Sequence, residues 1–337
     1  MKSMKRLWRF MVAFSVLGVL LLGSACADYT DRQEVQDYMA EVAAEHQFAV
    51  EDLERLFAQA RRQSSILEAI ARPAERVLKW HEYREIFLKE PRIEQGLEFW
   101  RNNAEALDAA TEAYGVAPEY VVAIIGVETR YGQITGGYRV IDALTTLAFD
   151  YPPRSPFFRK ELTQFLLLAR EEGRDPLELS GSYAGAMGYG QFIPSSYRSY
   201  AVDFDGDGQR DIWTNTRDAI GSVANYFARH GWEPGGEVVR QVAVAGNAAD
   251  PVANQSLELK YTVGELRSLG VQAEGLEADR RAALFRMELE DGAEYWLGLN
   301  NFYVITRYNR SRLYALAVHQ LAQAIRDRRG PASREEP

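Results

Sequence analysis

The sequence has 337 residues, 47% of them hydrophobic, and carries a formal net charge of −9. A chain of this length and composition is able to bury more than one hydrophobic core. The acidic balance, with no basic stripe in the sequence, argues against nucleic acid as a partner. The absence of GxSxG, P-loop and GxGxxG motifs argues against serine hydrolases and nucleotide-binding enzymes.

The first 27 residues predict a targeting segment rather than a part of the fold. A basic start precedes the apolar residues 10–22, and its basic residues are Lys2, Lys5, Arg6 and Arg9. The apolar run is too short to span a membrane comfortably and has the form of a signal peptide. We therefore expect the protein to leave the cytoplasm.

The residues after the apolar run, GSACA, allow two ways of processing. Cleavage after Ala27 fits a small-x-small signal-peptidase site and leaves a mature chain that starts at Asp28. Alternatively, Cys26 becomes the lipidated first residue of a lipoprotein, although Gly23 stands where leucine is preferred. We favour lipidation because Cys26 is the only cysteine of the chain. With no second cysteine there is no internal disulfide, so the fold depends on packing.

Residues 28–110 predict an N-terminal helical domain. Stretches such as VQDYMAEVAAEH and EDLERLFAQAR space their apolar residues three and four positions apart, which is typical of amphipathic helices. The stretch WHEYREIFL, which begins at Trp80, precedes a further helix that contains Phe99 and Trp100.

The segment APEYVVAIIGVETRYG, residues 117–132, predicts a helix with a carboxylate on its apolar face. Pro118 suits the first helical turn, and Gly132 suits the residue just past the last. Residues with the spacing i, i+3, i+4, i+7 share one face, here Val121, Ile124, Ile125 and Glu128. A buried carboxylate at this position is either paired or held protonated for work as an acid.

Residues 181–197, GSYAGAMGYGQFIPSSY, form a glycine-rich loop. Its glycines let backbone approach backbone, or let a ligand approach backbone. The loop is therefore either a tight connection between packed helices or one wall of a groove. In the second case Ser182 and Gln191 point toward a polar ligand, and composition leaves both interpretations open.

The motif DFDGDGQRDIW, residues 203–213, is similar to the front of an EF-hand loop. Oxygen-bearing side chains alternate with other residues at Asp203, Asp205, Asp207, Gln209 and Asp211. Gly208 stands at the sixth position, where such a loop turns sharply so that alternate oxygens converge on Ca²⁺. The motif therefore predicts a calcium site.

The end of this loop departs from the EF-hand pattern. The twelfth position is Thr214 rather than a bidentate glutamate, so we expect Asp218 to supply the missing carboxylate. Asp218 is also a good N-cap for the helix that follows. The alternative is a solvated turn without metal, and repulsion among the aspartates argues against it.

The last third of the chain changes character. Residues 235–298 predict a small α+β domain, with a helix that starts at the capping box of Thr262 and Glu265 and stops at Gly270. Residues 299–327 return to helix, and residues 328–337 predict a flexible tail. On pattern alone, Tyr308 and Tyr314 belong to an ordinary aromatic core.

Five segments, in this order, resemble the family-3 lytic transglycosylases of bacterial cell walls. They are ETRYG, GSYAGAMGYGQFIPSSY, AVDFDGDGQRDIW, DAIGSVANYFARHGW and NFYVITRYNRS. The resemblance covers residues 31–326 and implies a mainly α fold, α+β overall. A lysozyme-like core would occupy residues 111–234, with the calcium loop at 203–218, and the helical and α+β domains would surround a long groove.

The resemblance also implies an activity and a place in the cell. The substrate would be peptidoglycan, cleaved between N-acetylmuramic acid and N-acetylglucosamine to leave a 1,6-anhydro ring, without an organic cofactor. Implied partners are glycan strands, other cell-wall enzymes and, where Cys26 is lipidated, the outer membrane. The expected compartment is the periplasm, in soluble form if cleavage follows Ala27.

By motif, the resemblance assigns a role to individual residues. Glu128 is the catalytic acid and base. The substrate-binding residues are Tyr83, Arg154, Ser182, Gln191, Tyr226, Tyr308, Asn309 and Tyr314. The Ca²⁺ ligands are Asp203, Asp205, Asp207, Gln209 and Asp218. Arg154 matches one arginine of a pair near the peptide stem, but its neighbour here is Pro153, so the pair is halved.

One carboxylate suffices for this reaction if the substrate supplies the nucleophile, here the C6 hydroxyl of the sugar. Three alternatives remain. A hydrolytic muramidase would need a second carboxylate, for which Asp142 and Asp150 are the nearest candidates. A non-catalytic peptidoglycan-binding scaffold would need none. In a purely structural role, Glu128 would pair with an arginine such as Arg130 or Arg139.

Overall fold

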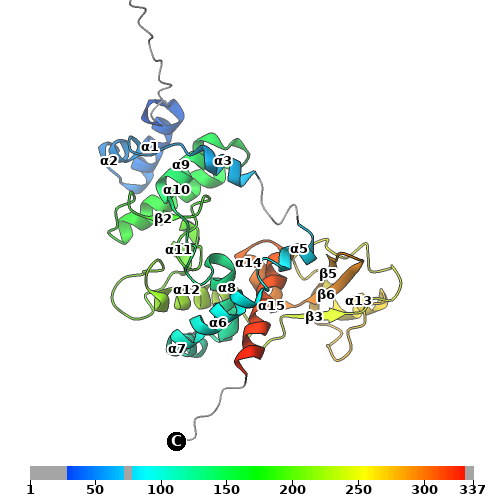
Figure 1. Cartoon of the computed structure of the whole chain (residues 1–337). Coiled ribbons are helices and arrows are strands. Elements are labelled where there is room, and N and C mark those ends of the chain that lie inside the picture. The colour runs from blue at the N-terminus through cyan, green and yellow to red at the C-terminus, as the bar shows by residue number, and fades with distance from the viewer. Residues whose placement is uncertain (1–28, 72–77, 331–337) are drawn as a thin grey trace, which may run out of the picture.

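The structure, a computed structural model, describes residues 29–71 and 78–330 and is mainly helical (Figure 1). Its strands form one four-stranded antiparallel sheet and one short two-stranded pairing. The predicted fold class is therefore confirmed. The predicted signal segment, with Cys26, lies outside the described residues. Within the described ranges no helix combines the length and apolar character needed to cross a membrane.

The first helices pack against two later helices at the top of Figure 1. The first helices are η1 (Tyr29–Asp31), α1 (Gln33–His46), α2 (Val50–Phe57) and α3 (Ser64–Ile70). The later ones are α9 (Val140–Asp150) and α10 (Ser155–Glu171). Tyr38 of α1 meets Phe149 of α9 edge-on, with ring centroids 5.6 Å apart. Aromatic packing of this kind joins segments that are about a hundred residues apart in the chain.

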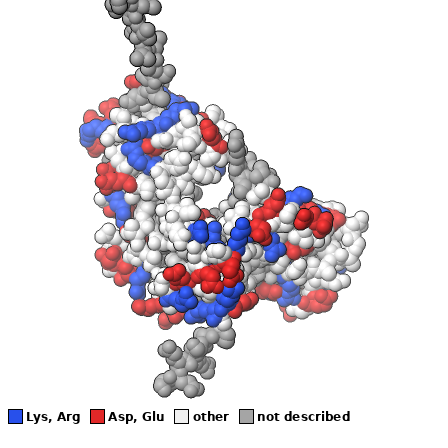
Figure 2. Space-filling view, in the orientation of Figure 1, with Lys and Arg blue, Asp and Glu red and all other residues white. Residues whose placement is uncertain are grey.

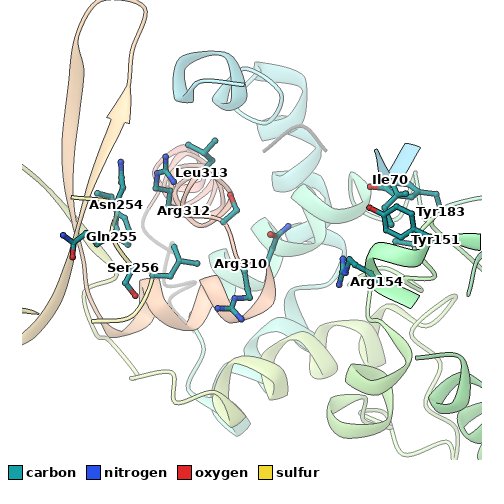
Figure 3. A pocket seen from close by; sticks show the side chains of 15 residues that line it. Ile70, Tyr151, Arg154, Tyr183, Asn254, Gln255, Ser256, Arg310, Arg312 and Leu313 are labelled. Atoms are coloured by element: carbon teal, nitrogen blue, oxygen red, sulfur yellow. The ribbon is translucent and has the colours of Figure 1, made fainter. Parts of the chain in front are cut away.

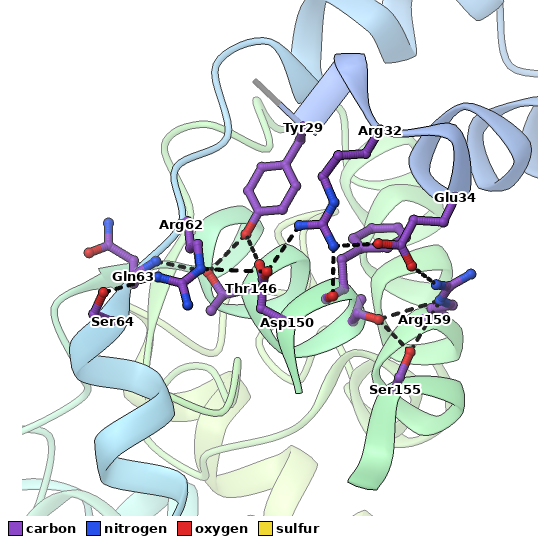
Figure 4. A network of polar contacts seen from close by, with 12 residues as sticks. Tyr29, Arg32, Glu34, Arg62, Gln63, Ser64, Thr146, Asp150, Ser155 and Arg159 are labelled. Atoms are coloured by element: carbon purple, nitrogen blue, oxygen red, sulfur yellow. Dashed lines mark hydrogen bonds and ion pairs between the residues drawn. The ribbon is translucent and has the colours of Figure 1, made fainter. Parts of the chain in front are cut away.

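Polar contacts fix the same layer to the end of α9 (Figure 4). The carboxylate of Asp150 accepts hydrogen bonds from Tyr29 Oη at 2.7 Å and from Arg32 Nη1 at 3.0 Å. Arg62 Nε lies 3.5 Å from the same carboxylate. Asp150 is therefore occupied by structural partners.

Asp142, earlier in α9, is a second structural carboxylate, and its replacement by asparagine should destabilise the fold. It is 3% exposed and accepts hydrogen bonds from Arg139 at 2.8 and 2.9 Å and from the Arg61 N–H at 2.8 Å. We expect Asp142→Asn to lower the free energy of unfolding by about 2 kcal/mol, because it weakens a charge-assisted fork in a buried place. Urea unfolding measures this, and Asp108→Asn on an exposed surface should change little.

A second group of helices lies below the first in Figure 1 and surrounds α8 (Pro118–Thr129). These helices are α5 (Trp80–Arg84), α6 (Glu90–Asn102), α7 (Ala104–Tyr114), α12 (Thr216–Arg229), α14 (Asn300–Tyr308) and α15 (Arg312–Arg329). The helix α8 packs against α6, α7, α12 and α15. It is apolar on nearly all sides, which is typical of a helix inside a core.

These contacts divide the chain differently from the predicted helical domain 28–110. The helices α1 and α3 pack on α9 and α10, with α2 on α1, whereas α5–α7 pack on α8, α12 and α15. The predicted tail is also corrected, because α15 runs to Arg329 rather than to residue 327. Arg328 is held in the helix by ion pairs to Glu90 and, at 2.8 Å, to Glu94.

The small α+β part lies beside the second group of helices. Its antiparallel sheet has the order β3-β6-β5-β4. The elements are β3 (Val239–Val242), β4 (Tyr261–Thr262), α13 (Val263–Ser268), β5 (Arg281–Glu288) and β6 (Ala293–Gly298). The capping box of Thr262 and Glu265 is confirmed. Trp80 of α5 donates to Glu294 Oε1 of β6 at 2.8 Å, which fixes the sheet to the helices.

Short elements complete the described part: β1 (Tyr138–Arg139), η2 (Pro152–Arg154), β2 (Ser180–Gly181) and α11 (Pro194–Tyr200). The pair β1–β2 joins the segment after α8 to the start of the glycine-rich loop. The two segments that the sequence singles out are therefore neighbours in space.

Candidate active site

Glu128 lies in the last turn of α8 and is half-buried. Tyr314, in the first turn of α15, donates a hydrogen bond from Oη to Glu128 Oε1 at 2.5 Å. The Tyr314 side chain is 2% exposed, and burial together with the nearby carboxylate raises its pKa well above the ordinary value. Tyr314 therefore remains a hydrogen-bond donor to Glu128 across the working pH range.

The arginines that could have paired with Glu128 have other partners. Arg130 Nε donates to Gln95 Oε1 at 2.8 Å, and the Arg139 guanidinium binds Asp142. Both arginines therefore have structural partners of their own, Gln95 and Asp142.

The end of α8 is sharper than the sequence predicts. Arg130 and Tyr131 take left-handed conformations with φ of 52° and 60°, before Gly132 at φ 83°. Such angles are strained for residues with side chains. The Gly132 N–H donates to Thr129 Oγ1 at 3.0 Å, and a Cβ at Gly132 would lie 2.0 Å from the Tyr189 ring. The strained turn thus presses the end of α8 against the glycine-rich loop.

The glycine-rich loop holds its own backbone together. The Ser182 hydroxyl accepts a hydrogen bond from the Ala186 N–H at 3.1 Å. The Gln191 amide donates to the carbonyls of Thr135 at 3.1 Å and Gly188 at 3.0 Å. A Cβ at Gly188 would lie 2.4 Å from a backbone oxygen. The glycines therefore let backbone approach backbone, as expected for a tight connection between packed elements. Gln191 also lines a hollow, as expected for the wall of a groove.

That hollow is lined by the predicted aromatic residues. Gln191, Tyr226 and Tyr308 border a space of about 470 Å³. Tyr308 Oη donates to the Gly190 carbonyl at 2.5 Å and Tyr226 Oη to the Arg307 carbonyl at 2.6 Å. Both hydroxyls are bound to backbone carbonyls. A ligand in this hollow would therefore contact the rings of Tyr226 and Tyr308 rather than their hydroxyls.

A second hollow of about 640 Å³ adjoins the first and extends toward the small α+β part (Figure 3). Asn309 and Arg154 line it, so two further predicted residues face this space. Arg154 is exposed and lies over the Phe157 ring, 4.3 Å from its centroid. We use "the groove" below for this hollow.

Tyr83 has a different place from the one predicted. Its side chain is 2% exposed and its ring lies 5.3 Å from that of Phe87. Its proximity adds to the raised pKa of Tyr314. Tyr83 therefore supports the Glu128–Tyr314 pair from within the core rather than lining a described hollow.

Several residues that line the groove were not predicted from the sequence. They are Tyr183, Asn254, Gln255, Ser256, Arg310 and Arg312. The 254–256 segment comes from the small α+β part, and only the tertiary arrangement brings it here. Arg310 lies between α14 and α15, and Arg312 is the first residue of α15; their charge was the one available signal.

Three of the predicted metal ligands converge. Carboxylate oxygens of Asp203, Asp205 and Asp218 lie within 4.8 Å of one another. Asp218 is fully buried, and its two oxygens accept the N–H groups of Phe204 and Asp211, each at 2.7 Å. Burial, followed by repulsion from the other two aspartates, raises the pKa of Asp218. A divalent cation would relieve this repulsion, so the donor set fits Ca²⁺.

The rest of the loop differs in detail from the prediction. Asp207 is exposed and lies outside this group of three, with its carboxylate accepting the Gln209 N–H at 2.8 Å. Gln209 is exposed as well. The N-cap of α12 is Asn215 rather than Asp218, because the Asn215 side chain accepts the N–H groups of the first turn. Asp218 therefore does not cap the helix, and its carboxylate instead accepts N–H groups of the loop, from Phe204 and Asp211.

Comparison with known proteins gives consistent matches. The family model described as "Transglycosylase SLT domain" matches residues 30–323. Membrane-bound lytic murein transglycosylase B of Escherichia coli (strain K12) is 43% identical over 308 residues, which cover 88% of this chain and 84% of that protein.

Two solved structures are similar over most of the chain. Catenated lytic transglycosylase SltB1 from Pseudomonas aeruginosa is 52% identical with a TM-score of 0.86, and the match covers 90% of this chain and 100% of that one. The Escherichia coli lytic transglycosylase Slt35 in complex with calcium is 43% identical with a TM-score of 0.80, over 88% and 94%.

Proposed function

Because this chain belongs to the transglycosylase SLT family and is a lytic transglycosylase that acts on peptidoglycan, we propose that Glu128 is its catalytic acid and base. The observation that carries this proposal is the 2.5 Å hydrogen bond from the buried Tyr314 to Glu128. A half-buried carboxylate that accepts a hydrogen bond from a buried tyrosine is suited to proton transfer in a defined direction. Glu128 is not itself among the described residues that line the two hollows; Tyr308, whose pKa is raised by burial and by the Glu128 carboxylate, lines the first of them.

The reaction proceeds in two steps. Protonated Glu128 donates its proton to the glycosidic oxygen as the bond from C1 to that oxygen breaks. The 2-acetamido oxygen of N-acetylmuramic acid stabilises C1. The C6 hydroxyl then attacks C1 and gives its proton to ionised Glu128, which closes the 1,6-anhydro ring. Glu128 ends protonated, and no water is consumed.

The masses of the products test whether the cleavage is non-hydrolytic. Purified peptidoglycan digested by the enzyme should give fragments one water lighter than hydrolysis products, as measured by mass spectrometry. Reducing ends at the new termini would instead establish water as the nucleophile. If no fragments form, the result would favour the alternative of a non-catalytic peptidoglycan-binding scaffold.

Tyr314 is proposed as a positioning residue for Glu128. Replacement by phenylalanine keeps the ring and removes only the donor to Glu128 Oε1. We expect kcat to fall about tenfold with KM little changed, because a hydrogen bond to a charged group is lost. Initial rates on soluble glycan strands at several concentrations measure kcat and KM separately. An equal change in kcat for Tyr308→Phe, whose hydroxyl binds the Gly190 carbonyl, would mean that both act through packing.

The remaining predicted residues are proposed to shape and line the substrate site. Gln191, Tyr226 and Tyr308 would bind sugar units with an amide and two ring faces, and Asn309 would continue this surface into the groove. Ser182 would hold the loop in shape, Tyr83 would support Tyr314, and Arg154 would face an anionic substituent.

Calcium binding is proposed for the loop between α11 and α12. Asp203, Asp205 and Asp218 would supply carboxylate ligands, and Gln209 would contribute its backbone carbonyl as the seventh EF-hand position does. Asp207 belongs to the motif but lies outside the group of three. The ion would neutralise the cluster and fix the start of α12, which is a structural role.

The hydrolytic alternative lacks its second carboxylate at the predicted positions. Asp142 accepts the Arg61 N–H and Asp150 accepts a hydrogen bond from Arg32, so both attach the N-terminal segment to α9. The two variants Asp142→Asn and Asp150→Asn should lose stability but still produce anhydro ends. Loss of product with an intact fold would assign the carboxylate a catalytic role.

A location in the periplasm is proposed, with Cys26 as the site of a lipid anchor in the outer membrane. The support is the signal-like sequence and the membrane-bound relative of Escherichia coli. Metabolic labelling with a fatty acid analogue, compared with Cys26→Ala, tests the anchor. Other cell-wall enzymes remain proposed partners.

A further inference from the structure

The left-handed turn that follows Glu128 needs support from outside its own helix. Arg130 and Tyr131 both have positive φ values, which residues with side chains rarely adopt. A helix that ends in this conformation usually does so with a single glycine. Strain of this kind persists only where surrounding contacts hold it, and it gathers at functional sites. The contacts that hold this turn come from α6.

Two side chains of the turn bind α6. Arg130 Nε donates to Gln95 Oε1 at 2.8 Å, and Tyr131 Oη donates to the Arg92 carbonyl at 2.9 Å. Tyr131 is 8% exposed, and burial raises the pKa of its hydroxyl, so it stays a hydrogen-bond donor. The two residues that follow α8 are therefore held by the same neighbouring helix.

The ring of Tyr131 fits because two helices lack a side chain where it lies. A Cβ at Gly96 of α6 would lie 2.6 Å from Tyr131 Oη, and a Cβ at Gly126 of α8 would lie 2.6 Å from the ring. Glycine inside a helix is less stable than alanine, so the close fit to the ring explains both positions. The ring also packs on Phe99, with centroids 5.8 Å apart. Tyr131 is thus seated in a slot between α6 and α8.

Arg92 contacts the end of α8 on both sides of Glu128. Its Nη1 donates to the Gly126 carbonyl at 2.6 Å, and its own carbonyl accepts the hydrogen bond from Tyr131 Oη. Gly126 precedes Glu128 in the sequence, and Tyr131 follows it. A cation at the C-terminal end of a helix also interacts favourably with the helix dipole. One residue of α6 therefore fixes the backbone before and after Glu128.

The helix α6 is itself joined to α15, the helix that supplies Tyr314. Figure 2 shows acidic and basic side chains together over the lower group of helices, and Arg328 of α15 pairs with Glu94 of α6 at 2.8 Å. Exposed ion pairs contribute little to stability, so close packing matters more. Ile325 of α15 packs where Gly96 leaves room, because a Cβ there would lie 2.5 Å from Ile325 Cδ1. The helices α6 and α15 therefore hold the end of α8 together.

We propose that Arg92 and Tyr131 are positioning residues for Glu128, which keep the end of α8 in its left-handed turn and so aim the carboxylate at the scissile bond. This inference rests on the proposed function of Glu128. Neither residue is among the described residues that line the two hollows, so they act on glycan through Glu128 and not by contact in those hollows. A displacement of about 1 Å at a catalytic group can lower a rate about a hundredfold.

Three variants test the two residues separately. Arg92→Met removes the donor to the Gly126 carbonyl and keeps an apolar stem, whereas Arg92→Lys keeps a donor. Tyr131→Phe keeps the ring in its slot and removes only the bond to the Arg92 carbonyl. We expect Arg92→Met and Tyr131→Phe each to lower kcat about tenfold with KM little changed, and Arg92→Lys to recover part of the loss. Initial rates of anhydro-product formation on soluble glycan strands measure both constants. Tyr131→Phe keeps the test open if Arg92→Met does not fold.

Arg170→Met is the matched control, because it removes the same kind of bond from the end of a different helix. Arg170 Nη1 donates to the carbonyl of His46, the last residue of α1, at 2.7 Å. This variant should lower the melting temperature but leave kcat unchanged. All rates are compared well below the melting temperatures, so that the folded fraction is the same for each protein.

A double variant shows whether Arg92 acts through Glu128. In Glu128→Gln the proton transfer is already lost, so adding Arg92→Met should leave the small remaining rate unchanged. An equal fractional fall in rate with and without Glu128 would overturn the inference. Wild-type kcat in both Arg92→Met and Tyr131→Phe, or an equal fall in Arg170→Met, would overturn it as well. Failure of the proposed function is distinguishable, because Glu128→Gln alone would then retain turnover.

Discussion

Replacing Glu128 by glutamine is expected to lower kcat by a factor of about a thousand or more while the protein stays folded. Glutamine has the same shape but neither donates nor accepts the proton that both steps require, and acid–base catalysis by a positioned group contributes about 10² to 10⁴ in rate. Initial rates of anhydro-product formation, followed by mass spectrometry, measure the loss.

Stability and binding serve as controls for this variant. Glutamine still accepts the hydrogen bond from Tyr314 Oη, so the melting temperature should change by no more than a few degrees. Binding of glycan strands should persist. Substantial remaining turnover would exclude Glu128 as the acid, whereas a large fall in melting temperature would show that the loss arises from the fold.

Removing calcium is expected to lower the melting temperature by about 5 °C, since ligand bound at a hundredfold excess over Kd stabilises a fold by about 2.7 kcal/mol. Asp203, Asp205 and the buried Asp218 repel one another without a cation. Melting curves with added Ca²⁺ and with EDTA measure the difference.

A pair of variants makes this test specific to the loop. Asp203→Asn removes a carboxylate of the converging group and should abolish the effect of Ca²⁺ on the melting temperature. Asp207→Asn, at an exposed position outside the group, should reduce it less. Identical curves with Ca²⁺ and with EDTA in the wild type would count against a bound ion.

Local sequence patterns were sufficient to predict the helix α8 and the aspartate loop. Apolar spacing predicted the buried helix α8 and placed Glu128 near its end. Alternating aspartates indicated the loop that contains Asp203 and Asp205, and the lack of a carboxylate at the twelfth position indicated Asp218, which lies with these two in the structure. These signals succeed because helix faces and turn chemistry depend on neighbouring residues.

The features that the sequence did not reveal depend on distant contacts. The end of α8 at Thr129 follows from packing of Gly132 against Tyr189, and no local signal predicts left-handed Arg130. Asn215 rather than Asp218 caps α12, because loop contacts hold Asp218. The division of the first helices between two groups likewise depends on partners that occur later in the chain.

The bond between Tyr314 and Glu128 joins residues that are 186 positions apart. A chain is synthesised from its N-terminus, so Glu128 is made long before α15, which both contacts α8 and supplies this tyrosine. A chain still emerging from the ribosome, or cut before α15, therefore lacks the partner that fixes its carboxylate. The timing of synthesis thus keeps a wall-cleaving enzyme incomplete until α15 is in place.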